Sequence, residues 1–317
     1  MAIRHDWTAP EAFTILTSPL TDLLKHANEI HREFADHDVQ QCELLSVKTG
    51  ACPEDCGYCS QSAHVKTDIT MEPLMEPEKV IAAAKSAKER GATRFCMGAA
   101  WRDVPSDRRF ETVLSMIRGV AATGLEVCCT MGMATEAQLR RMKTAGLHSY
   151  NHNLDTSREH YPKVTTTRTY DDRLETLQAA RRAGVALCCG GILGLGETVN
   201  DRAAMLTELA RMNPHPESVP INLLVPVENT PMQTFAPVPF EEFLRAIASA
   251  RIMLPRARVR LSAGRNSLTQ EQQLACFYAG ANSIFIGDKL LTTPNVEWES
   301  DRSLLRLYET DEIRATD

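Results

Sequence analysis

The strongest constraint on how this chain folds is a regular alternation between short apolar runs and amphipathic helical segments. Apolar runs of this length predict buried strands, and the segments between them repeat apolar residues at helical spacing. The strand-like runs are 44–47, 94–97, 126–130, 148–152, 186–190, 219–223, 259–262 and 283–286. The helical segments are 78–90, 108–123, 135–145, 171–183, 200–212, 239–254, 269–279 and 301–308.

The order of these segments favours a closed α/β barrel. Eight strands that alternate with eight helices are the arrangement of a (β/α)8 TIM-type barrel. Several helices end at a glycine just before the next strand, as at Gly91, Gly124 and Gly184, and glycine is a common helix stop. A doubly wound open sheet is the structural alternative, because it uses the same alternation.

The segment ahead of the first strand has apolar residues on one helical stripe, with Leu20 and Ile30 among them. No linker rich in Gly or Ser marks a second domain. We therefore expect an N-terminal helical extension over 1–40, the barrel over 41–295, and a C-terminal helix and tail over 296–317.

Charge and hydropathy exclude several classes of function. The chain has 35 basic and 41 acidic residues without a basic stripe, so we expect a small-molecule substrate and no nucleic acid. No apolar run is long enough to span a membrane, and the N-terminus lacks an apolar signal segment, which favours the cytoplasm. Thiols stay reduced there, so ten cysteines indicate metal binding or catalysis before disulfides.

Three cysteines directly after the first strand form the clearest motif. Cys52, Cys56 and Cys59 have a C-x3-C-x2-C spacing, which lets three thiolates bind a [4Fe–4S] cluster and leaves one iron without a protein ligand. A structural zinc site is an alternative, but it uses four protein ligands, usually in two pairs, and no second pair follows nearby. A ferredoxin-like carrier would supply four cysteines.

The open iron connects this motif to a known superfamily. A C-x3-C-x2-C loop after the first strand of a barrel resembles the radical S-adenosylmethionine superfamily. The resemblance implies that the open iron binds the methionine part of the cofactor and that the reduced cluster generates a 5′-deoxyadenosyl radical. Tyr58 then matches the position that packs near the adenine, although loop packing alone also explains an aromatic residue there.

Three more cysteines lie on separate predicted strands. Cys96, Cys128 and Cys188 each fall within an apolar run. A buried cysteine usually behaves as a small hydrophobic residue, but three of them near the ends of barrel strands can converge on a site. Cys129 and Cys189 directly follow two of these, and adjacent strand residues point to opposite faces. Only one of each pair can face the interior, and parity alone does not select which.

Five blocks of the sequence resemble the biotin synthase family. They are 93–101, 150–156, 190–197, 219–222 and 259–265, and the match runs in the family's order from about residue 42 to residue 295. The resemblance implies a radical enzyme that inserts sulfur into dethiobiotin to form biotin. It also implies an electron donor of the flavodoxin or ferredoxin type and a homodimer.

The same resemblance assigns a second metal site. It implies that Cys96, Cys128 and Cys188 hold a [2Fe–2S] cluster, with Arg260 as an unusual fourth ligand. Arginine is normally a protonated donor, so this role rests on the resemblance alone. The remaining cysteines are then packing residues or bystander thiols: Cys42, Cys129, Cys189 and Cys276.

Polar residues near the end of the fourth predicted strand are candidates for substrate and cofactor contacts. Asn151, Asn153 and Asp155 alternate along the chain, so their side chains should share one face while His152 points away. Amides can donate to and accept from a cyclic urea such as dethiobiotin, and a carboxylate can accept from ribose hydroxyls. An Asn-His-Asn run is also a turn signal.

The resemblance divides these groups between two ligands. It implies that Asn151, Asn153 and Asn222 lie near dethiobiotin, and that Asp155, Arg173 and Ile192 lie near S-adenosylmethionine. Ile192 belongs to the glycine-rich stretch 190–197, which lacks the Lys-Ser/Thr pair of a P-loop. A loop that lets its backbone approach the cofactor is the inference from the glycines themselves.

The implied reaction has two kinds of rival. In the family reaction, a deoxyadenosyl radical abstracts hydrogen from dethiobiotin, and the carbon radical attacks a sulfide of the [2Fe–2S] cluster inside a dry cavity. Another radical enzyme on this barrel, of the hydrogenase-maturation or methylornithine-forming type, should not need the inner cysteines with Arg260. A non-catalytic iron–sulfur or zinc binding protein would have no use for Asn151, Asn153 and Asp155.

Overall fold

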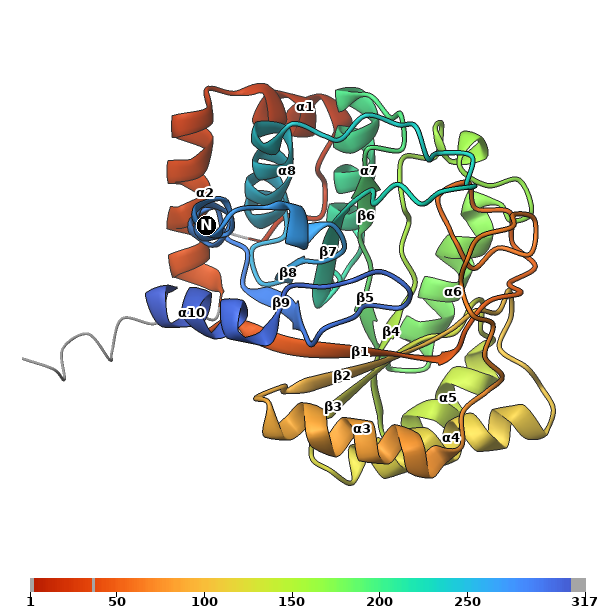
Figure 1. Cartoon of the computed structure of the whole chain (residues 1–317). Helices are drawn as coiled ribbons and strands as arrows, with labels where there is room; N and C mark the ends of the chain where they lie inside the picture. The colour runs from red at the N-terminus through yellow and green to blue at the C-terminus, as the bar shows by residue number, and fades with distance from the viewer. Residues whose placement is uncertain (1–2, 36–37, 309–317) are drawn as a thin grey trace, which may run out of the picture.

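The computed structural model of the chain describes residues 3–35 and 38–308 (Figure 1). At its centre is a ring of parallel strands. They are β1 (Gln40–Lys48), β2 (Arg94–Ala99), β3 (Glu126–Thr130), β4 (Leu147–Asn151), β5 (Ala186–Cys188), β6 (Gly191–Leu193), β7 (Ser218–Leu223), β8 (Arg258–Leu261) and β9 (Ser283–Ile286).

Hydrogen bonding closes this ring. β1 pairs with β2 on one side and with β9 on the other, and the pairings between these strands are all parallel. β5 and β6 occupy one strand position, because both pair with β7. An open sheet has two edge strands, and the sheet of the described residues has none. The (β/α)8 barrel is therefore confirmed, and the open-sheet alternative is wrong.

The fifth strand position differs from the prediction. The sequence predicts one strand over 186–190, but the structure divides this position into β5 and β6. A Cβ built on Gly190 would lie 1.9 Å from the carbonyl oxygen of Pro220, so the close approach requires a glycine. The Gly190 amide donates instead to the Asn153 side chain at 3.1 Å. This interruption brings the loop after β4 against the glycine-rich backbone.

Helices surround the ring (Figure 1). They are α1 (Ala9–Thr17), α2 (Leu20–Phe34), α3 (Pro77–Glu89), α4 (Arg108–Ala121), α5 (Glu136–Thr144), α6 (Tyr170–Arg182), α7 (Val199–Arg211), α8 (Phe240–Met253), α9 (Gln270–Tyr278) and α10 (Trp298–Tyr308). The ends of α3 to α10 lie within three residues of the predicted helices. No helix of the described residues is long and apolar enough to cross a membrane.

The N-terminal extension consists of two helices that pack on the outside of the barrel. α1 contacts α7, and α2 contacts α8. Pro19 separates the two helices at the N-cap of α2, because proline has no amide hydrogen to continue α1. Residues 1–2, 36–37 and 309–317 lie outside the described residues, so the predicted tail over 296–317 is described only through α10. The division into three segments stays a prediction.

Candidate active site

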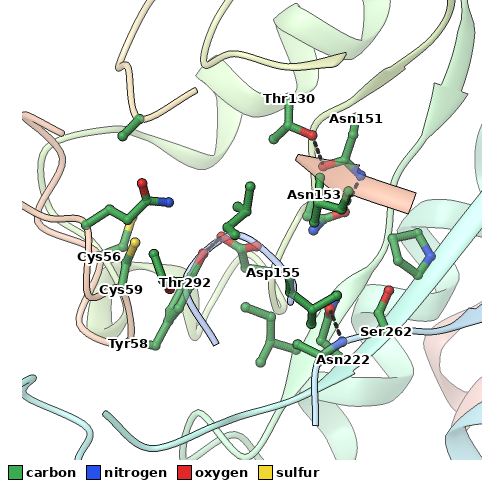
Figure 2. Close-up of a pocket in the computed structure, with 18 of the residues that line it drawn as sticks. Cys56, Tyr58, Cys59, Thr130, Asn151, Asn153, Asp155, Asn222, Ser262 and Thr292 are labelled. Atoms are coloured by element: carbon green, nitrogen blue, oxygen red, sulfur yellow. Dashed lines mark hydrogen bonds between the residues drawn. The ribbon is translucent and has the colours of Figure 1, made fainter. Parts of the chain in front are cut away.

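A cavity of about 340 Å³ is lined by residues from the carboxyl ends of the strands and from the loops that follow them. This end of a TIM barrel carries the active site. Figure 2 shows Cys56 and Cys59 on one side of the pocket, Asn151 and Asn153 on the other, and Asp155 between them. The cavity is bordered by all the residues that the sequence nominates: Cys52, Cys56, Tyr58, Cys59, Cys96, Cys128, Asn151, Asn153, Asp155, Arg173, Cys188, Ile192, Asn222 and Arg260.

Cys52, Cys56 and Cys59, which we call the loop set, follow β1 in a compact loop. The Cys52 amide donates to the Gln61 carbonyl at 2.9 Å, and the Cys59 amide donates to the Cys56 carbonyl at 3.0 Å. Ala51 enters the loop with a φ of 52°, in the left-handed region that non-glycine residues rarely adopt. Backbone hydrogen bonds therefore hold this motif in one conformation.

Two carboxylates between the first two cysteines anchor the loop to the rest of the barrel. Asp55 accepts from the Thr165 hydroxyl at 2.6 Å and from the Thr166 amide at 2.9 Å. Burial opposes ionisation of Asp55, but these hydrogen bonds hold its pKa well below the usual range. Glu54 is buried and pairs with Arg102 at 3.4 Å. The segment after β4 thus fixes the position of the loop set.

Burial disfavours ionisation of all three loop thiols. It raises the pKa of the Cys59 thiol to about 12, and the charge that Cys56 carries when ionised acts in the same direction. Burial likewise raises the pKa of the Cys52 and Cys56 thiols. Iron binds the thiolate form, so assembly of a cluster here must release protons.

Cys96, Cys128 and Cys188, which we call the inner set, come together inside the ring. Cys96 and Cys128 are register partners on β2 and β3, and both share an interior cluster with Cys188. Arg260 on β8 donates from Nη1 to the Cys188 sulfur at 3.6 Å. The strand positions alone do not show whether these three cysteines converge. In the structure they do.

The other buried cysteines divide between two compartments. Cys129 and Cys189 lie in the outer core between strands and helices, as the alternation of strand faces requires. Cys276 lies in the same outer core. Cys42 instead lies in the interior cluster with the inner set, so it packs inside the ring and not in the outer core.

The two cysteine sets fit iron–sulfur clusters. Within residues 3–35 and 38–308, no three His, Cys, Asp or Glu side chains surround a point that could hold a single ion. The cysteines of a cluster bind different irons, so their sulfurs need not converge on one point. The inner site also contains a buried donor without a partner, Nη1 of Arg94. A buried donor needs an acceptor, and a cluster sulfide or thiolate is one.

A buried ion pair lies on the wall between the two sets. Nη2 of Arg173 pairs with Oδ2 of Asp155, and Nη1 donates to the Asn153 carbonyl at 2.7 Å. The Tyr58 hydroxyl donates to the same Asp155 oxygen at 3.2 Å. Asp155 has a φ of 67°, so the chain turns here and is no longer a strand. Because β4 ends at Asn151, these contacts and not strand alternation bring the groups together.

The asparagines are held in fixed orientations by bonds within the protein. Nδ2 of Asn151 donates to Oδ1 of Asn153 at 3.2 Å and to the Cys188 sulfur at 3.2 Å. Nδ2 of Asn222 donates to the Gly191 carbonyl at 2.9 Å, and its Oδ1 accepts from a backbone amide after β8 at 3.1 Å. The amide groups therefore line the cavity with little freedom to rotate.

Sequence reasoning missed several residues of the cavity wall. His152 is among the residues that border the cavity, and its ring stacks with that of Tyr150 at a centroid distance of 6.5 Å; the expected direction of its side chain stays a prediction. Arg168 also borders the cavity and is only 8% exposed, with no partner for its Nε. Leu290 packs against the inner set, and the Thr292 hydroxyl lies 3.0 Å from that of Ser60. None of these residues has a periodic or spacing signal that would have nominated it.

Comparison with known proteins shows the family to which this chain belongs. The model of the radical SAM superfamily matches residues 46–209, and that of the biotin and thiamin synthesis associated domain matches 220–310. Biotin synthase from Sorangium cellulosum is 57% identical over 305 residues, which cover 96% of this chain and 87% of that protein. Biotin synthase from Cytophaga hutchinsonii is 55% identical over 306 residues, with coverage of 96% and 91%. The chain belongs to the biotin synthase family.

Solved structures of more distant proteins share the barrel. The FeFe-hydrogenase maturase HydG from Carboxydothermus hydrogenoformans superposes with a TM-score of 0.80 at 17% identity, covering 95% of this chain and 75% of that one. Methylornithine synthase superposes with a TM-score of 0.80 at 18% identity, covering 96% and 92%. At such low identity the likeness shows a common fold alone, whereas the biotin synthase relatives match along nearly the whole chain.

Proposed function

We propose that this chain inserts sulfur into dethiobiotin to form biotin, with S-adenosylmethionine as its source of radicals. The observation that carries the proposal is the placement of the loop set and the inner set on one cavity. The ion pair of Arg173 and Asp155 lies on the wall between them, where a cofactor and a substrate can be held next to each other.

The two sets differ in the cluster that each would hold. The loop set would bind a [4Fe–4S] cluster, and the inner set, with Arg260, a [2Fe–2S] cluster. When bound, the first supplies the electron that cleaves S-adenosylmethionine and the second supplies the sulfur atom. Three loop thiolates leave one iron without a protein ligand, so the amino and carboxylate groups of the cofactor have a place to bind.

Residues between the two sets would position the cofactor. Arg173 and Tyr58 fix the Asp155 carboxylate from two directions, which presents it to the ribose hydroxyls in one orientation. Ile192 and Tyr58 pack with an apolar cluster formed by Val164, Leu195 and Met232. An apolar wall of this kind suits the adenine ring, whose faces need no hydrogen bonds.

Dethiobiotin would lie against the asparagines. Asn151 contacts the Cys188 sulfur, so a ureido ring bound by Asn151, Asn153 and Asn222 lies beside the inner set. The C–H bonds of the substrate are not usefully acidic, and the reaction therefore needs positioning and exclusion of water in place of an acid or base. Phe285 and Leu290 pack on the inner set and shield it from solvent.

We propose the remaining partners on less direct grounds. Cys52 and Cys59 are only partly buried, which supports electron delivery from outside by a flavodoxin or ferredoxin. The homodimer and the cytoplasmic location rest on the family resemblance and on the cysteine usage of the chain.

Turnover of dethiobiotin tests the proposed function. The chain is reconstituted with iron and sulfide without oxygen, reduced, and supplied with S-adenosylmethionine and dethiobiotin. Biotin and 5′-deoxyadenosine are then measured by mass spectrometry. The proposal predicts that biotin forms and that deoxyadenosine formation depends on dethiobiotin. Cleavage of the cofactor without formation of biotin would contradict the proposal that dethiobiotin is the substrate. A cofactor that stays intact would contradict the proposed radical chemistry.

A further inference from the structure

Cys42 is a fourth cysteine at the inner site. It lies on β1, is completely buried, and belongs to the same interior cluster as the inner set. Its register partners are Arg94 on β2 and Phe285 on β9. Neither the proposed reaction nor the family assignment gives this thiol a role.

Cys42 and Arg260 occupy the same corner of the barrel interior. The Cys42 sulfur lies 3.6 Å from Oε1 of Gln40 and 3.7 Å from Oγ of Ser283. Nη2 of Arg260 donates to the same Gln40 oxygen at 3.4 Å, and Nε donates to the same Ser283 hydroxyl at 2.9 Å. Two shared side chains therefore join the thiol to the guanidinium.

A second observation indicates that this corner lacks an acceptor. Arg94, the register partner of Cys42, is 3% exposed and pairs with Glu126 at 2.8 Å. Its Nη1 has no partner, although a buried donor should have one. A cluster held next to Cys42 would provide sulfide or thiolate sulfur at this position.

We propose that Cys42 is a reserve ligand of the inner cluster, which binds iron in place of Arg260. Four thiolates are the ordinary ligand set of a [2Fe–2S] cluster, and the inner set with Cys42 supplies four. The inference rests on the proposed function, because the reaction removes a sulfide from this cluster, and an anionic thiolate would hold the remaining iron more tightly than a neutral guanidine nitrogen. Cys42 then retains the iron until the sulfide is replaced.

The exchange between the two ligands balances within the protein. In the exchange, iron would lose its bond to the neutral Arg260 nitrogen and gain a bond to the Cys42 sulfur. The thiol proton would pass to the released Arg260, which would become the guanidinium cation. The Ser283 hydroxyl contacts both groups and provides the path. No oxidant or reductant is needed.

Loss of Arg260 with and without Cys42 tests this inference. The variants are Arg260→Met, the double variant Arg260→Met with Cys42→Ser, and Cys42→Ser alone. Cys276→Ser is the matched control, because Cys276 is equally buried but lies in the outer core. Each is reconstituted anaerobically and analysed for iron, sulfide and Mössbauer spectrum, and thermal unfolding of the metal-free protein verifies the fold. Cys42→Ala, which unlike Cys42→Ser introduces no hydroxyl that could bind iron, should behave like Cys42→Ser.

The expected result is a loss that appears only in the double variant. Arg260→Met should retain the inner cluster with all-cysteine ligation, and the double variant should lose its iron, about two atoms per chain. If Arg260→Met and the double variant retain the inner cluster equally, or lose it equally, this inference is overturned and the proposed function is not affected. If the wild-type chain instead holds about four irons and no [2Fe–2S] signal, the proposed function fails and this inference fails with it.

Discussion

The loop set and the inner set place three cysteines each on one cavity, but they are built in different ways. The loop set lies within the span 52–59 and is held by hydrogen bonds of its own loop and of the segment after β4. The inner set takes one cysteine from each of β2, β3 and β5. The loop set is a local sequence motif. The inner set forms only in the folded barrel, because its cysteines come from three strands.

The comparison shows that local spacing is enough to form the loop set, whereas the inner set requires the complete fold. A loop of eight residues can wrap one cluster wherever the chain displays it, and it leaves an iron open for a ligand. An interior set of buried thiols is surrounded by protein and carries its own charged neighbours, Arg94 and Arg260. The loop set therefore suits exchange with cofactor and reductant, and the inner set suits a reaction that must exclude water.

The largest expected effect is loss of the loop set, which should leave the inner set intact. Cys56→Ala should remove the [4Fe–4S] cluster, about four irons per chain, and abolish both cofactor cleavage and biotin formation. The inner cluster should remain, because no residue of β2, β3 or β5 changes. Mössbauer spectra of the reconstituted variant check this, and loss of both signals would show that the two sites are not independent.

Two adjacent cysteines test the inner set. Cys128→Ala should remove the [2Fe–2S] signal and biotin formation while cofactor cleavage persists, because Cys128 faces the interior. Cys129→Ala, its neighbour in the outer core, should keep both clusters and lower the free energy of unfolding by about 1 kcal/mol. Sulfide analysis and chemical denaturation measure the two results. Similar cluster loss in both variants would mean that strand parity does not determine the ligand.

The ion pair between the sets should affect binding more than cluster content. Asp155→Asn leaves the Arg173 cation without its carboxylate, which should raise the KM for S-adenosylmethionine roughly tenfold or more, as one charge-assisted hydrogen bond is worth about 1.5–3 kcal/mol. Iron content should be unchanged. Steady-state kinetics at saturating dethiobiotin measure the KM. An unchanged KM with a lower kcat would show that Asp155 does not contribute to binding of the cofactor.

The smallest effect on turnover is expected far from both sets. Arg265 and Asp301 form a buried pair, with N–O distances of 2.6 and 2.8 Å, that joins α10 to the loop after β8. Asp301→Asn should lower the free energy of unfolding by about 3 kcal/mol, because it leaves Arg265 buried and unpaired. Turnover per assembled cluster should not change. A drop in turnover with full iron content would instead give α10 a part in the site.

Much of the fold follows from the sequence because barrel elements are local patterns. The alternation of strands and helices and the ends of α3 to α10 follow from apolar periodicity and glycine stops. The break at Gly190 does not, because it arises from contact with Pro220 on another strand. Strand alternation likewise does not fix the direction of the His152 side chain, because β4 ends at Asn151.

The two cysteine sets differ in the same way. The spacing of Cys52, Cys56 and Cys59 is a local signal, and it identifies the loop set without any structure. Convergence of the inner set needs the register of β2 with β3, which the sequence does not contain by itself. Cys42 lacked any signal because the residues around it come from β2, β8 and β9.

The central claim is that one barrel holds two iron–sulfur sites with separate roles, and Mössbauer spectroscopy across a single turnover tests it most directly. The reconstituted wild-type chain is measured before and after it converts one equivalent of dethiobiotin. We predict two signals at the start, and loss of the [2Fe–2S] signal in proportion to the biotin formed while the [4Fe–4S] signal persists. A single cluster type at the start, or biotin formed while both signals stay constant, would contradict the account.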